Sequence, residues 1–117
     1  MKCVTVATVS LVGNLNFYNV YITVSNQTPV QGVEVTVYKY LNPQTNSFVN
    51  PCSVAYLSGL CNNPAITDDK GQATLCMIPG IYIIELSYQG YVNYATIMVS
   101  KNEEFELPFY FSNFSPP

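Results

Sequence analysis

The sequence predicts an all-β fold, an antiparallel β-sandwich of seven or more strands with an extra strand at the N-terminus. Helix signals are nearly absent, because no segment shows sustained apolar spacing at i, i+3 and i+4 or a convincing capping box. Alternating apolar and polar residues recur instead in short segments, and Gly, Pro and Asn separate these segments at short intervals. The 117 residues suit a single domain, residues 1–117.

The first predicted strand spans residues 4–12, within an N-terminal extension of residues 1–17. Lys2 and the mildly apolar stretch after it also fit a signal peptide, but Thr and Ser interrupt that stretch. We therefore expect a strand, which either adds to the sheet of a neighbouring subunit or folds back on its own sheet. Its apolar members are Val4, Val6, Val9 and Leu11.

Two strands with a clear period of two follow. In residues 17–25, Val20, Ile22 and Val24 share one face. Residues 33–40 alternate most cleanly, with valines facing inward and polar or aromatic residues facing outward. Both segments are therefore expected to be half-buried strands of the sandwich.

Residues 41–64 interrupt the strand pattern. The segment is rich in Asn, Pro and Ser and contains Cys52 and Cys61. A loop this long is usually functional or held by its own crosslink. We expect an insertion loop that a disulfide closes near its base.

Strand signals continue to the C-terminus. Residues 81–84 are apolar at successive positions, which favours a central strand covered on both faces. Pro108 cannot donate to a ladder, so the last strand is expected at a sheet edge or at a bulge. The predicted strands are residues 65–67, 72–77, 81–88, 92–100 and 105–111.

The four cysteines are Cys3, Cys52, Cys61 and Cys76. Two disulfides are favoured over free thiols or a metal site, because structural thiolate sites use closely spaced pairs and this chain has no C-x-x-C. Three pairings are possible. We expect Cys52 to bond Cys61 across a short loop, which leaves Cys3 for Cys76. Disulfides imply an oxidising setting, and we expect an extracellular, cell-surface or virion protein.

Composition excludes several functions. Charged residues make up 9% of the chain, against about 25% in an ordinary soluble protein. With 4 Lys and Arg and a net charge of −3, no basic surface for nucleic acid or anionic membranes is expected. No stretch is long and apolar enough for a membrane span.

We expect neither an enzyme nor a cofactor. The chain has no His, which is the commonest general base and metal ligand, and no Ser has a base candidate near it. Asp68 and Asp69 lie in a turn where Asp bonds the local backbone, so we prefer a turn to a calcium site there.

Asparagine and tyrosine offer surface functions. Asn26 and Asn113 match the N-glycosylation pattern, although a Pro follows each acceptor triplet. Ten Tyr and six Phe form a large aromatic content, most of which can lie in the core. Four are expected to face outward, as contacts between subunits or as a stacking platform for sugars: Tyr21, Tyr38, Tyr40 and Tyr110.

Four short motifs occur in order along the chain. They are PVQGVEVTVY at residues 29–38, TDDKGQA at 67–73, PGIY at 79–82 and GY at 90–91. Together they resemble the carboxypeptidase regulatory-like domain, which belongs with the transthyretin-like and Cna-B-like seven-stranded sandwiches. The resemblance covers residues 18–107, with 41–64 as an insertion.

The resemblance implies a non-catalytic module of surface proteins, adhesins, pili or enzyme appendages. Together with the charge-poor composition, it leads us to expect a structural subunit of a pilus-like filament or a virion surface. Its partners would be further copies of itself or other surface or virion proteins. The alternative is a carbohydrate- or receptor-binding module that uses residues 41–64 for recognition, with glycans as partners.

Overall fold

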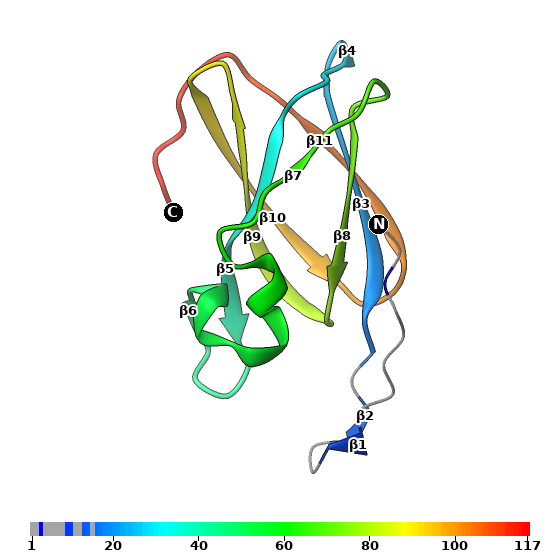
Figure 1. The fold of residues 1–117 in the computed structure, drawn as a ribbon. Coiled ribbons are helices and arrows are strands. Elements are labelled where there is room, and N and C mark those ends of the chain that lie inside the picture. Colours follow the sequence, from blue (N-terminus) through cyan, green and yellow to red (C-terminus); the bar gives the residue numbers. More distant parts are fainter. Residues whose placement is uncertain (1–2, 4–8, 11–12, 15) are drawn as a thin grey trace.

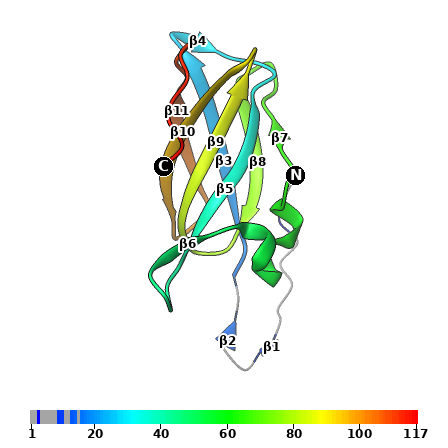
Figure 2. The ribbon, with the colours of Figure 1, turned by 90° about the vertical axis from the view of Figure 1, so that its left-hand side faces the viewer.

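The computed structural model describes residues 3, 9–10, 13–14 and 16–117. It confirms the predicted all-β sandwich, in which two sheets face each other across an apolar core (Figures 1 and 2). Because the alternating segments bury one face each, they pair into two layers.

The first sheet is built around β3 (Tyr18–Asn26). β8 (Gln72–Met77) and the short β4 (Thr28–Pro29) pair with it antiparallel, while β11 (Glu103–Pro108) pairs with it parallel on the other side. The parallel pair departs from the expected antiparallel arrangement. It arises because the chain crosses from the other sheet after β10 and enters beside the start of β3. β11 lies at the sheet edge, as Pro108 led us to expect.

The second sheet has the order β10 (Tyr91–Val99), β9 (Gly80–Tyr88), β5 (Glu34–Asn42). Two short strands, β6 (Ser47–Val49) and β7 (Ala65–Ile66), pair with opposite ends of the other edge of β5. β9 is therefore central, which agrees with its apolar start.

Alternate residues of both sheets form one core. The large side chain at its centre is Tyr82, whose hydroxyl donates to the Ile78 carbonyl at 2.6 Å. Burial raises the pKa of Tyr82 strongly, so its hydroxyl remains a donor. Its neighbours in the buried cluster include Val20, Ile22, Val24, Val35, Val37, Ile84, Leu86, Ile97 and Phe109.

The expectation that Tyr40 faces outward is wrong. Tyr40 is only 8% exposed and belongs to the core cluster. The reason is a β-bulge: Val37 faces Ile84 of β9, but Lys39 faces Ile83, so β5 holds one extra residue there. A bulge reverses the inside and outside positions beyond it, which turns Tyr40 inward onto Tyr82.

The N-terminal extension contains a small hairpin in its described part. β1 (Val9–Ser10) pairs antiparallel with β2 (Gly13–Asn14), and both lie beyond the end of the sandwich (Figures 1 and 2). Val4, Val6 and Leu11 of the predicted strand lie outside the described residues.

The insertion at residues 41–64 has more regular structure than expected. It contains β6 and two 3₁₀-helices, η1 (Pro51–Ser53) and η2 (Ala55–Leu60). Such short helices leave no 3.6-residue period in a sequence, which is why none was predicted. Leu57 of η2 is buried in the core cluster, so this segment is packed onto the sandwich. We call residues 43–64 the cap.

Gly71 closes the turn between β7 and β8. Its backbone has φ +75°, and its carbonyl accepts the Val24 N–H at 2.7 Å. A Cβ added there would lie 2.6 Å from the Val24 carbonyl oxygen. Only glycine allows both the left-handed backbone and this approach.

We expect Gly71→Ala to lower the free energy of unfolding by about 2 kcal/mol or more, because it combines backbone strain with a collision against β3. Gly59→Ala is the matched control, since nothing lies within 4 Å of its added Cβ. Urea unfolding of both variants measures the difference. Equal stability of the two variants would contradict this description of the turn.

Candidate functional site: the cap end of the sandwich

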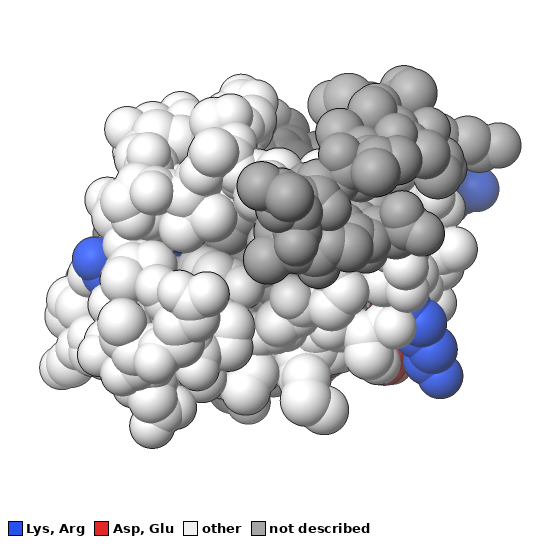
Figure 3. Space-filling model, turned by 90° about the horizontal axis from the view of Figure 1, so that it is seen from below, with Lys and Arg blue, Asp and Glu red and all other residues white. Residues whose placement is uncertain are grey.

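Two long stretches of the chain at one end of the molecule lack charge. Residues 40–67 and 71–84 contain no Asp, Glu, Lys or Arg, and they supply the cap, β6, β7, β8 and the start of β9. Figure 3 views the sandwich from this end, and the acidic and basic residues visible in it lie near the margins. A surface with so few charges is typical of the buried centre of a protein interface.

An apolar groove opens at this end between the cap and β8. Its volume is 350 Å³. It lies where β7 and β8 diverge to different sheets, and no acidic or basic side chain among the described residues lines it. The lining residues are Phe17, Tyr56, Gly59, Leu60, Asn63, Pro64, Ala65, Thr74, Leu75 and Cys76.

The edge of β8 faces this groove. The Gln72 carbonyl accepts the Asp68 N–H at 3.0 Å, which shows that it points away from β3. Backbone groups alternate in direction along a strand, so those of Thr74 and Cys76 point the same way. No described residue forms a backbone hydrogen bond with them. With respect to the described residues, this edge of β8 therefore has no backbone partner, and it is called the open edge of β8.

Two disulfides flank the groove, with the pairing expected from the sequence. Cys3 forms a disulfide with Cys76, and Cys52 forms one with Cys61. The Cα–Cα distances are 5.2 Å and 4.8 Å, respectively. The Cys3 N–H also donates to Asn19 Oδ1 at 2.6 Å, which attaches the N-terminus to the outer face of β3 and β8. The two disulfides indicate a non-reducing setting.

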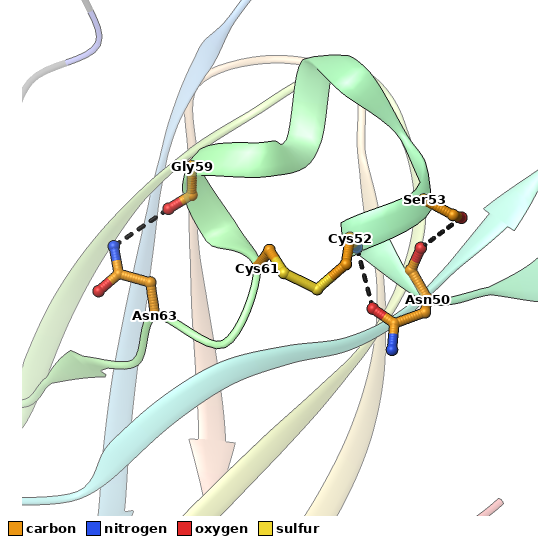
Figure 4. The surroundings of a disulfide bond; sticks show 6 residues. All are labelled: Asn50, Cys52, Ser53, Gly59, Cys61 and Asn63. Carbon is orange, nitrogen blue, oxygen red and sulfur yellow. Dashed lines mark hydrogen bonds between the residues drawn. A yellow bond between two sulfur atoms is a disulfide. The ribbon is translucent and has the colours of Figure 1, made fainter.

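The short disulfide holds the cap in shape (Figure 4). Asn50 Oδ1 accepts the Cys52 N–H at 2.9 Å and begins η1, and the Asn50 carbonyl accepts the Ser53 hydroxyl at 2.7 Å. At the other side, Asn63 Nδ2 donates to the Gly59 carbonyl at 3.0 Å. Side-chain amides therefore fix both ends of a loop that contains no charge.

The four predicted surface tyrosines do not form one surface. Tyr21 lies half-buried on the outer face of the first sheet, and Tyr40 lies in the core. Tyr38 lies on the outer face of the second sheet, 5.0 Å from the Tyr94 ring and 5.3 Å from Lys39 Nζ. Tyr110 is 52% exposed in the C-terminal tail and stacks on Phe114.

Sequence reasoning missed two aromatic residues at the cap end. Phe48 of β6 is 45% exposed, and Tyr56 of η2 is 43% exposed and lines the groove. Their only sequence signal is their place in a long segment without charge. They add exposed ring surface beside the open edge of β8.

Asn93 attaches the C-terminal tail to the sandwich. It is 1% exposed, donates from Nδ2 to the Tyr110 and Ser112 carbonyls at 3.0 Å each, and accepts the Tyr110 N–H at 2.7 Å. The tail is also fixed by the Phe114 N–H, which donates to the Val92 carbonyl at 2.9 Å. One buried amide thus satisfies three backbone groups of the tail.

The two predicted glycosylation sites both take part in hydrogen bonds. Asn113 Oδ1 accepts the Val92 N–H at 3.0 Å, which leaves its nitrogen for a glycan. Asn26 Nδ2 donates to the Phe109 carbonyl at 2.8 Å, so a glycan there would attach to a nitrogen already bonded to the tail.

Asp68 has the turn role expected of it. Its Oδ1 accepts the Lys70 and Gln72 N–H groups at 2.9 and 3.0 Å, and these bonds hold the pKa of Asp68 below its usual value. Within the described part of the chain, no three His, Cys, Asp or Glu residues are grouped as metal ligands.

Among the described residues, no helix has the length and apolar character needed to cross a membrane. No protein-family model matches this chain, and no curated protein is significantly similar to it in sequence.

The two disulfides are expected to differ in their contribution to stability. They span 73 and 9 residues. Loop-closure entropy predicts losses of about 4 kcal/mol for Cys3→Ser with Cys76→Ser and about 2.5 kcal/mol for Cys52→Ser with Cys61→Ser. Urea unfolding under oxidising conditions measures both, and a larger loss from the shorter loop would contradict the entropic account.

Asn93→Ala is expected to lower the free energy of unfolding by about 2 kcal/mol or more, because it leaves backbone groups of the tail without hydrogen-bond partners. Hydrogen exchange of the Tyr110 and Phe114 amides should accelerate. Gln44→Ala removes an exposed amide in the cap and serves as the control. Unchanged exchange at both amides would show that the tail is held by other contacts.

Proposed function

We propose that this chain is a non-catalytic structural subunit of an extracellular assembly, a pilus-like filament or a virion surface. The observation that supports this most is the apolar groove beside the open edge of β8, where residues 40–67 and 71–84 carry no charge. Subunits would join by β-strand addition at this edge, with aromatic contacts around it.

Strand addition suits the geometry of β8. The outward backbone groups of Thr74 and Cys76 would bond an added strand, and its alternate side chains would enter the groove. The groove is lined by Leu60 and Leu75, so it favours aliphatic residues. Burying uncharged partners there involves no loss of ion hydration.

The occupant we propose is the segment 4–12 of a neighbouring copy. Its sequence contains valine, leucine, alanine, threonine and serine, with no charge, which matches the groove. Tyr56 and Phe48 lie at the same end and would add aromatic contacts around the added strand.

We also infer that the chain belongs with the carboxypeptidase regulatory-like sandwiches. Residues 29–38 run from β4 into β5, and residues 67–73 form the turn that leads into β8. Gly80 begins β9, and Tyr82 two residues later lies at the centre of the core. Three of the four motifs thus coincide with the turns and strands that such a module would require.

The alternative is a carbohydrate- or receptor-binding module that recognises its ligand with the cap, Tyr38 and Tyr40. It is less favoured, because Tyr40 packs in the core and is not available as a platform.

The chain of residues 1–117, produced with its disulfides and without denaturant, should form filaments or closed particles in negative-stain microscopy and light scattering. Gly59→Lys should abolish assembly, since the new side chain has room but places a charge at the groove. Gln44→Lys places the same charge on an exposed loop residue outside the groove lining and should assemble normally.

A second pair of variants tests the strand edge itself. Thr74→Pro removes an N–H that points away from β3, so the fold should remain while strand addition fails. Thr74→Val keeps this N–H and should still assemble. A monodisperse 13.0 kDa monomer of the unaltered chain would refute the proposal. So would normal assembly of the Gly59→Lys and Thr74→Pro variants.

A further inference from the structure

The end of the sandwich opposite the cap contains a second hollow of a different kind. β4 lies at this end, with the turn between β9 and β10 and the start of the C-terminal tail (Figures 1 and 2). The hollow has a volume of 490 Å³, within the range of about 300–1,000 Å³ typical of small-molecule sites. Its lining residues are Asn26, Thr28, Pro29, Val30, Gln31, Tyr88, Gln89 and Phe111.

The polar groups of this hollow are neutral. Asn26, Gln31 and Gln89 supply amides, each of which has both donors and acceptors, and Thr28 and Tyr88 supply hydroxyls. Among the residues that the structure describes, no acidic or basic one lines it, so neither an inorganic anion nor a metal cation would find a counter-charge. A ligand rich in hydroxyl groups matches this combination of donors and acceptors.

Several of these groups are available for a ligand. The side chains of Gln31 and Thr28 are exposed, and they form no hydrogen bond with any residue that the structure describes. Gln89 Nε2 donates to the Tyr88 hydroxyl at 3.3 Å, a long bond that a ligand hydroxyl could replace.

Two aromatic rings contribute to the apolar part of the hollow, together with Pro29 and Val30. Tyr88 packs edge-on against Phe109 at 5.8 Å, and Phe111 lies 5.5 Å from Phe109 and 6.4 Å from Tyr88. The Tyr88 ring also covers Gly32, where an added Cβ would lie 3.7 Å from Cε1. Rings fixed in this way provide an ordered surface against which the C–H face of a sugar can pack.

The backbone around the hollow is held in place. Asn26 Nδ2 donates to the Phe109 carbonyl at 2.8 Å, and the Phe109 N–H donates to the Ser25 carbonyl at 2.8 Å. These bonds join the tail to the end of β3, on which β4 folds back. The backbone of the tail and of the β3–β4 connection is therefore held in place beside the hollow, which reduces the entropy lost on binding.

We propose that this hollow is a binding site for a neutral saccharide of one or two sugar units. The amides and hydroxyls would bond the sugar hydroxyls, while Tyr88 and Phe111 would pack against its C–H face. The proposal is independent of subunit assembly, because the hollow and the groove at β8 lie at opposite ends of the sandwich. A small, open site of this kind predicts a dissociation constant of about millimolar.

Saturation-transfer difference NMR tests this site, because it observes the ligand and works for monomers and large assemblies alike. The full chain, produced without N-glycosylation, is mixed with about 20 mM glucose, galactose, mannose, N-acetylglucosamine or their neutral disaccharides. Omitting glycosylation matters, since a glycan on Asn26 would lie at the same hollow. Glucuronic acid and glycerol are the comparison probes.

At least one neutral saccharide should receive saturation, and the combined variant Gln31→Ala with Gln89→Ala should reduce that signal about fivefold or more. Gln44→Ala, an exposed amide of the cap, should leave it unchanged. Both altered glutamines are exposed, so the variants should fold. The proposal is overturned by a lack of signal from every neutral saccharide, by equal signal from glycerol, by preference for glucuronic acid, or by full signal in the combined variant.

Discussion

The hydrogen bonds of side-chain amides hold the connections of this sandwich in place. A chain with 9% charged residues has few ion pairs available, yet its loops and tail must be fixed to two sheets. Asn93 binds the C-terminal tail, Asn50 begins η1, and Asn19 binds the backbone of Cys3. A neutral amide can donate and accept at once, and its burial costs far less than burial of a charge. In this chain, asparagine amides therefore fix the loops and the tail in the way that ion pairs do in more highly charged proteins.

Much of the fold could be predicted because its strands are half-buried. Alternation revealed β3 and the first part of β5, and successive apolar residues revealed that β9 is central. The burial of Tyr40 was not predicted, because a bulge reverses the inward and outward positions of a strand without altering its residue pattern. The parallel pairing of β11 with β3 was not predicted, because contacts between distant segments leave no local signal in the sequence.

The candidate sites were harder to foresee than the fold. The short disulfide followed from the nine-residue separation of Cys52 and Cys61, but the groove it flanks exists only because β7 and β8 diverge to different sheets. The second hollow combines β3, the end of β9 and the tail, which are far apart in sequence. A site built from separate segments requires the tertiary structure, whatever the composition of each segment.

The Cys3–Cys76 disulfide sets a condition on how subunits can exchange strands. It fixes the beginning of the N-terminal extension to the outer face of β8, through the same residue whose backbone points toward the groove. A chain that donates its segment 4–12 would therefore keep Cys3 at its own β8 while the following residues reach a neighbour. The donated segment and the acceptor edge would then lie on one side of the subunit, so that each copy can donate and accept at the same end. Such a contact can be reciprocal, joining two copies as a closed pair, or it can be passed on from copy to copy as an open chain. In the assembly proposed above, a closed particle and a filament would thus differ in the direction in which the donated segment leaves the disulfide.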